Sequence, residues 1–285
     1  MPVTFDAETY RADSRGSWDK AATGWTARRA AMQDDTAAVS QWLVDSVDPR
    51  PGQTVLEVAA GLGDTGLLAA ARVGPDGQVI LTDGSDAMVT AAAEHAKAQG
   101  AVNVTARQME AEWLDQGTAT VDAVLCRWGY MLCADPEAAF REARRVLRPG
   151  GRIALAAWEP LDENPWIAVI VGALDQQGIA APPKAGAPGM FGLAVPGQVE
   201  ELLASGGFTD VKRATVDFTF RAASLDAWWE HTKAVSVSLS EAIKDLPPAG
   251  HYLLRDAVDE GYAPYVAADG SVELPARALM ACAEA

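Results

Sequence analysis

Strand-length apolar runs alternate with segments of helical periodicity through the middle of the chain. The pattern predicts strands at residues 54–59, 78–82, 102–108, 121–126 and 152–158. Helices are expected around 67–71, at 86–99 and at 136–147. Ser85 is suited to cap the second of these helices, because its hydroxyl can accept from a backbone N–H of the first turn. Strands that alternate with helices predict an α/β fold with a parallel sheet and right-handed crossovers.

The two flanks of this repeating unit have a different pattern. Residues 1–50 favour helix and end at a Pro- and Gly-containing breaker. Beyond residue 158, helical segments and a Pro/Gly-rich loop precede an alternating strand at 209–220 and a last apolar strand at 277–283. The chain is therefore expected to have three parts: an N-terminal helical lid at 1–50, an α/β core at 51–160, and the rest of the sheet with helical insertions at 161–285.

Composition and charge narrow the class of protein. Of 285 residues, 49% are hydrophobic and 22% charged, which is typical of a globular protein, and no apolar run is long enough to span a membrane. With 23 Lys and Arg against 39 Asp and Glu, the net charge of −16 argues against a nucleic-acid partner. Three cysteines without metal-ligand spacing argue against disulfides and a metal site. Together with the N-terminal sequence, they favour a cytoplasmic location.

A glycine-rich turn follows the first predicted strand, within the run from Val55 to Gly66. Glycines at this place let the backbone turn sharply and approach a ligand, and the next helix offers unpaired N–H groups. Gly61, Gly63 and Gly66 also satisfy the dinucleotide fingerprint G-x-G-x-x-G, with Asp83 about twenty residues further on. An NAD-dependent oxidoreductase is therefore one interpretation of this turn.

Two acidic residues at the turn favour a different cofactor. Asp64 would place a carboxylate beside the pyrophosphate of a dinucleotide, and Glu57 adds a second negative charge nearby. S-adenosylmethionine (SAM) has no phosphate and carries a cationic ammonium and a cationic sulfonium. The acids therefore favour SAM.

Further candidate residues lie where predicted strands end, which is where open parallel sheets bind ligands. Asp83 can accept from both hydroxyls of a ribose, and Met88 can pack on an adenine face. Glu110 and Ala111 follow the third strand, where an acid can accept from the adenine amino group. Arg127 follows the fourth strand in an aromatic setting.

These motifs resemble those of class I SAM-dependent methyltransferases, and most closely the type 11 branch that includes ubiquinone/menaquinone C-methyltransferases. The similarity covers roughly residues 50–160 and includes the turn at 55–66, the strand end that begins Asp83-Gly84, and the segment 109–112. It implies a Rossmann-like, seven-stranded, mostly parallel sheet with an antiparallel last strand, helices on both faces and helical lid segments. It also implies Gly61 and Gly63 beside the methionine part of SAM, Asp83 on the ribose, and Glu110 with Ala111 near adenine.

The expected function is transfer of a methyl group from SAM to a small-molecule acceptor. The alternatives are an NAD-dependent oxidoreductase and a non-catalytic SAM-binding protein. His231 is the candidate catalytic residue on the substrate side, without an assigned proton transfer; His251, Tyr130 and Arg127 are alternatives. The sequence leaves open both the oligomeric state and whether the acceptor atom is O, N, C or S.

Overall fold

Seven strands form one sheet in the computed structural model, which describes residues 5–285; the first four residues of the expected lid lie outside this range. The strands are β1 (Thr54–Glu57), β2 (Gln78–Asp83), β3 (Val104–Gln108), β4 (Val121–Arg127), β5 (Leu147–Trp158), β6 (Thr209–Ala222) and β7 (Val272–Glu284). Their spatial order is β3-β2-β1-β4-β5-β7-β6, and β7 runs antiparallel to both of its neighbours while the other pairs are parallel. The predicted Rossmann-like sheet with an antiparallel last strand is confirmed.

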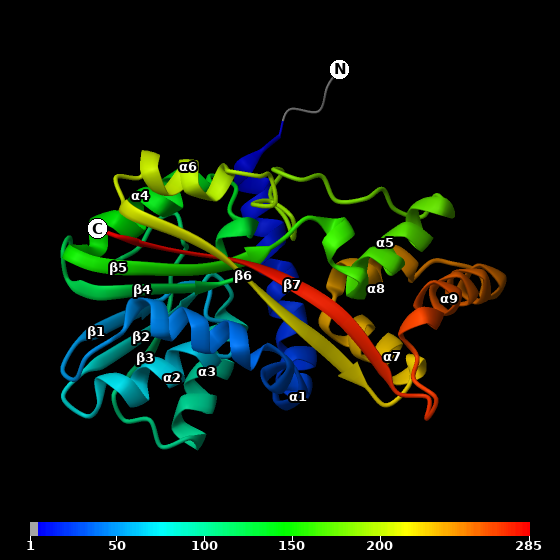
Figure 1. Cartoon of the computed structure of the whole chain (residues 1–285), viewed down its shortest axis with the longest axis horizontal. Helices are drawn as coiled ribbons and strands as arrows, with labels where there is room; N and C mark the ends of the chain where they lie inside the picture. The colour runs from blue at the N-terminus through cyan, green and yellow to red at the C-terminus, as the bar shows by residue number, and fades with distance from the viewer. Residues whose placement is uncertain (1–4) are drawn as a thin grey trace.

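Helices cover both faces of this sheet (Figure 1). They are α1 (Ala7–Val47), α2 (Asp64–Val73), α3 (Asp86–Ala98), α4 (Pro136–Val146), α5 (Pro165–Gln176), α6 (Gln198–Ser205), α7 (Leu225–Val235), α8 (Val237–Ile243) and α9 (Pro248–Tyr262), with 3-10 turns η1 (Tyr130–Leu132), η2 (Leu161–Glu163) and η3 (Ala263–Tyr265). The second half of α1 packs with α2 and α3 on one face, and α4 and α6 pack on the other. Helices α5 and α7–α9 gather around the far ends of the long strands β6 and β7.

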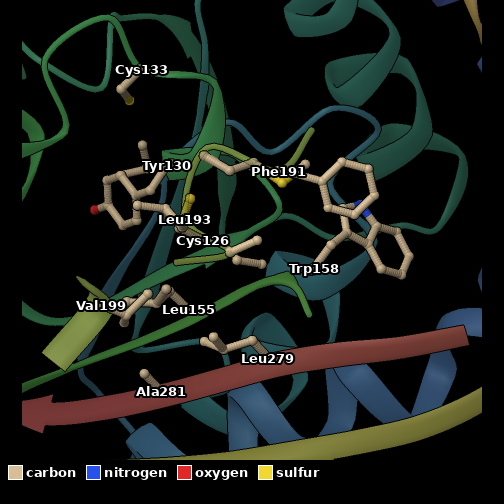
Figure 2. Packing of buried hydrophobic residues seen from close by; sticks show 14 of the residues in the cluster. Cys126, Tyr130, Cys133, Leu155, Trp158, Phe191, Leu193, Val199, Leu279 and Ala281 are labelled. Carbon is tan, nitrogen blue, oxygen red and sulfur yellow. The ribbon is translucent and has the colours of Figure 1, made fainter. Parts of the chain in front are cut away.

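The central strands β1, β2, β4 and β5 are apolar on both sides because both sides are covered. In β1, Val55 faces the α1–α3 layer and Leu56 the α4–α6 layer; in β5, Ala154 and Leu155 divide in the same way. Figure 2 shows Leu155 on the second side, near Val199 of α6. Continuous apolar runs were thus the right signal for strands in this sheet.

Helix α1 differs from the expected lid at 1–50. It is one helix of 41 residues, and its second half belongs to the core: Val39, Leu43 and Val47 are buried against the sheet. Its first half extends past the strand ends, where Ala21 and Ala22 are buried instead. The two halves bury the same side of the helix, since Ala21 and Ala22 lie about five full turns before Val39 and Ser40, but they pack against different partners.

Two strands begin earlier than predicted. Strand β7 begins at Val272 instead of 277, because its first part alternates buried Val272 and Leu274 with exposed Glu273 and Pro275 while pairing with the end of β6. Strand β5 begins at Leu147 instead of 152, and its first residue pairs with Val121 of β4 across a register shift.

Candidate active site

The turn between β1 and α2 is tightly coiled. Ala59, Gly61 and Gly63 all have positive φ (51°, 55° and 78°), a conformation that glycine adopts without strain and alanine does not. A Cβ on Gly63 would lie 2.6 Å from Leu81 Cδ1, so this glycine allows the turn to pack on β2. A Cβ on Gly61 would meet nothing within 4 Å. The backbone at Gly61 therefore has the conformation and the free space that close approach of a ligand needs.

Asp83 joins this turn to the end of β2. Its Oδ2 accepts from the backbone N–H of Gly61 at 2.9 Å and its Oδ1 from that of Ser85 at 2.9 Å. Burial raises the pKa of Asp83 above its ordinary value, while the two N–H donors act in the opposite direction. A carboxylate has about four lone-pair sites, so Asp83 can still accept from ribose hydroxyls. The structure thus places Asp83 and Gly61 together, as a shared site requires.

Gly84, Glu110 and Ala111 lie next to Asp83. A Cβ on Gly84 would be 3.1 Å from Glu110 Oε2, so the turn after β2 contacts the segment after β3. Ala111 is partly buried against the main core. Met88 is 1% exposed and packs with Ala21 and Ala22 of α1 and Leu62 of the glycine turn. These residues converge at the carboxyl ends of β2 and β3; their contacts with a cofactor stay a prediction.

Glu57 and Arg127 are both predicted to bind the cofactor. In the structure, both side chains are largely buried next to the glycine turn. Glu57 Oε2 accepts from the backbone N–H of Gly66 at 2.7 Å, at the start of α2. The Arg127 guanidinium donates to the hydroxyls of Thr36 and Ser40 of α1, both at 3.0 Å. Loss of solvent raises the pKa of Glu57 to about 8, and the nearby Arg127 acts against that shift. The geometry gives both residues contacts that hold the turn and α1 in place; direct contact of either with the cofactor stays a prediction.

Asp64 completes this buried charged group. Its Oδ1 accepts from Arg29 of α1 at 2.8 Å, and His95 Nδ1 lies 2.9 Å from the carbonyl oxygen of Leu62 in the turn. His95 is therefore part of the support of the turn. Its place on α3 gave no local signal for this contact, because the partner lies 33 residues away.

The first half of α1 is tied to the strand ends by polar contacts that sequence reasoning missed. Arg11 Nε donates to Glu112 Oε2 at 2.8 Å, and Arg15 donates to Glu110 Oε1 at 2.6 Å. Asp19 Oδ1 accepts from the hydroxyl of Ser85 at 2.6 Å. Helix α1 therefore covers the segments that carry the adenine and ribose candidates.

Besides Arg127, the candidates for a catalytic group are His231, His251 and Tyr130, and their surroundings differ greatly. His231 of α7 is stacked on Trp228, with ring centroids 5.4 Å apart, and burial lowers its pKa below the ordinary value. His251 is exposed on α9. Tyr130 is fully buried in the core beside Phe140 (Figure 2 shows it among apolar side chains), and burial raises its pKa well above 10. Tyr130 is thereby unsuited to act as a base near neutral pH, whereas His231 stays a candidate.

An aromatic cluster lies on the other side of the site, around the carboxyl ends of β4, β5 and β6. Its members come from segments far apart in the sequence and are Trp128, Trp158, Trp166, Phe218, Phe220 and Trp228. Trp128 and Trp158 are stacked with centroids 4.6 Å apart and planes 12° apart. The strand order therefore separates an acidic, glycine-rich side over β3-β2-β1 from an aromatic side over β4-β5-β7-β6.

Comparisons with known proteins agree with this site. A family model described as a methyltransferase domain matches residues 55–151. Nocamycin O-methyltransferase of Saccharothrix syringae is 32% identical over 70% of this chain and 76% of its own length. A ubiquinone/menaquinone biosynthesis C-methyltransferase of Idiomarina loihiensis is 34% identical over 40% of this chain, which spans only 46% of that relative. The crystal structure of the YcgJ protein from Bacillus subtilis shares the fold, with a TM-score of 0.59, 19% identity, and coverage of 86% of this chain and 97% of that one.

The chain belongs to the class I SAM-dependent methyltransferases. It is an enzyme whose cofactor is SAM, and the alternatives of an NAD-dependent oxidoreductase and a non-catalytic binding protein are set aside. The residues present fit this cofactor: the carboxylates of Asp83 and Glu110 can accept hydrogen bonds from ribose hydroxyls and an adenine amino group, and the backbone is open at Gly61.

Two kinds of feature are absent from residues 5–285. None of the helices in this part of the chain has the length and apolar character to cross a membrane. In the same residues, no group of three or more His, Cys, Asp or Glu side chains is placed to hold a metal ion.

Proposed function

We propose that this methyltransferase acts on an oxygen atom of a small, planar, largely apolar acceptor. The observation that carries this proposal is the aromatic cluster beside the cofactor residues. Flat aromatic side chains bind planar rings through offset stacking and edge contacts. The choice of oxygen is supported by the similarity to nocamycin O-methyltransferase, of which this chain covers 76%.

The two sides of the site divide the work of binding. On the acidic side, we assign Asp83 to the ribose hydroxyls, Glu110 and Ala111 to the adenine, and Gly61 and Gly63 to the methionine part. When bound, SAM supplies a methyl group on a positively charged sulfur. Methyl transfer is an in-line displacement, so the protein must hold the acceptor oxygen opposite the leaving sulfur. The aromatic rings are suited to this because their own packing fixes them.

Helix α1 supplies the cover that this reaction needs. Its first half is tied to Glu110 and Glu112 through Arg15 and Arg11. Covering the reacting atoms excludes water, which would otherwise solvate the nucleophile. We therefore propose the first half of α1 as the lid, while its second half stays in the core.

The test is product analysis. Purified protein is incubated with SAM and a panel of small planar phenols and enols, matched with amines and thiols on the same rings. We expect S-adenosylhomocysteine and an equal amount of an O-methyl ether from oxygen acceptors of this kind. Excess S-adenosylhomocysteine, as a competing ligand, serves as the control for uncatalysed methylation. Exclusive formation of N-, S- or C-methyl products would contradict the proposal.

A further inference from the structure

Trp128 departs from ordinary side-chain behaviour in two ways. Its backbone φ is +60°, a left-handed conformation that is rare for a bulky residue. Its indole N–H is buried and has no hydrogen-bond partner in the described part of the protein. Both features cost stability, and such features concentrate at functional sites. Because a buried N–H without a partner is unfavourable, a ligand atom that accepts from it would be bound more tightly.

The conformation of Trp128 is held by its surroundings. Its backbone N–H donates to the carbonyl oxygen of Ala156 at 2.9 Å, and its ring is stacked on Trp158. The next residue, Gly129, packs on the glycine turn, since an added Cβ would lie 2.4 Å from Ala59 Cβ. The ring is therefore fixed immediately beside the turn that approaches the cofactor.

Trp128 also lies at the boundary between the two sides of the site. Strand β4, which it follows, is adjacent to β1 with its glycine turn and to β5 with Trp158. The ribose and adenine candidates Asp83 and Glu110 lie further out, over β2 and β3. The methyl group must pass from one side to the other at this boundary, so a donor here lies where the acceptor oxygen has to be held.

We propose that the indole N–H of Trp128 donates a hydrogen bond to the oxygen of the acceptor and selects for acceptors that carry one. This inference rests on the proposed function, because it assumes a planar oxygen-bearing acceptor. Trp128 is then the positioning and specificity residue of the aromatic side.

The experiment compares two probes, 2-naphthol and naphthalene, which share a ring system and differ in one oxygen. Their affinities for the protein saturated with S-adenosylhomocysteine are measured by equilibrium dialysis. One hydrogen bond predicts that the wild type prefers 2-naphthol by about three- to tenfold. Trp128→Phe keeps a ring on Trp158 but removes the N–H, so the preference should disappear while naphthalene binding is retained. Trp42→Phe is the control, because Trp42 lies in the second half of α1, outside the aromatic cluster, and its loss should leave the preference unchanged.

The possible outcomes separate the two proposals. If the wild type binds neither probe, the proposed planar acceptor is wrong and this inference falls with it. If Trp128→Phe keeps the preference for 2-naphthol, only the role of Trp128 is wrong. If the variant instead weakens S-adenosylhomocysteine binding in calorimetry, the N–H serves the cofactor and the inference is overturned.

A second measurement needs no variant. The nine tryptophans each give one indole N–H signal in a nitrogen-correlated NMR spectrum of the wild type. One signal should move downfield with 2-naphthol and stay in place with naphthalene. An unchanged indole spectrum at saturating 2-naphthol would overturn the proposal.

Discussion

The strands on the two sides of the site differ in length and in the segments to which they connect. Strands β1, β2 and β3 have 4, 6 and 5 residues and lead into glycine and acidic residues, whereas β5, β6 and β7 have 12, 14 and 13. The short strands carry the candidate cofactor residues within a few positions of each strand end. The long strands instead reach the helices α5 and α7–α9 (Figure 1). The aromatic cluster joins them, since Trp158 of β5 contacts Trp166 of α5, which contacts Trp228 of α7. The cofactor side is thus built from local sequence, and the acceptor side from contacts over long distances in the chain.

Removing the carboxylate of Asp83 should have the largest effect, and only on the cofactor side. Charge-assisted hydrogen bonds to two ribose hydroxyls contribute about 1.5–3 kcal/mol each. We expect Asp83→Ala to weaken S-adenosylhomocysteine binding tenfold or more in calorimetry. The melting temperature should also fall, because Gly61 and Ser85 lose their acceptor. Asp76→Ala, in the exposed turn before β2, is the control. A folded variant with unchanged affinity would remove Asp83 from the site.

The difference between the cofactor side and the acceptor side explains how much of the site could be predicted from the sequence. The β1 turn, Asp83 and Glu110 were found because a strand, its following glycines and its terminal acid are contiguous. The contacts of Arg127 were not predicted, because its partners Thr36 and Ser40 depend on how α1 crosses the sheet.

Most of the aromatic cluster was not predicted at all. Trp158 meets Phe218 across 60 positions of the chain through the antiparallel strand β7, and no local pattern indicates that register. That the second half of α1 belongs to the core was missed for a related reason: its partners on α2 and the sheet lie far along the chain.

The support beneath the glycine turn should be sensitive to pH. Burial raises the pKa of Glu57 from 4.5 to about 8, so the folded state favours the protonated form. The contribution of Glu57 to the stability of the folded state is then fully present below about pH 4.5 and is lost as the pH rises towards 8. We expect the free energy of unfolding of the cofactor-free protein, measured with urea, to fall over this range. Glu57→Gln should flatten the decline, while Glu94→Gln on the exposed side of α3 should not. Equal slopes in all three proteins would mean that Glu57 stays ionised as a partner of Arg127.

The lid contacts should have an intermediate effect that links the two sides. Arg11→Gln leaves the carboxylate of Glu112, 5% exposed, without its charged partner and loosens the first half of α1. We expect S-adenosylhomocysteine affinity to fall by about three- to tenfold, the range for loss of one hydrogen bond. Hydrogen exchange in residues 7–25 should accelerate. Arg72→Gln breaks an exposed ion pair with Asp45 in the second half of α1 and should leave both readouts unchanged. The lid assignment fails if the two variants behave alike.

His231 should have the smallest effect, and it tests whether the acceptor side acts by chemistry or by position. Burial lowers its pKa, with the positive charge of Arg28 acting in the same direction, so the imidazole is neutral near pH 7 and could accept a proton. A general base contributes about 10²–10⁴ in rate. Yet His231 is stacked flat on Trp228, an arrangement that packing alone accounts for. Once an acceptor has been identified, we therefore expect His231→Ala to lower kcat by only a few fold. His231→Phe keeps the stacking on Trp228 and should lower kcat by less. His251→Ala, exposed on α9, is the control. If His231→Ala and His231→Phe both lower kcat a hundredfold or more, and both remove the fall of kcat at acidic pH, His231 moves a proton. The aromatic side would then be a catalytic region as well as a binding surface.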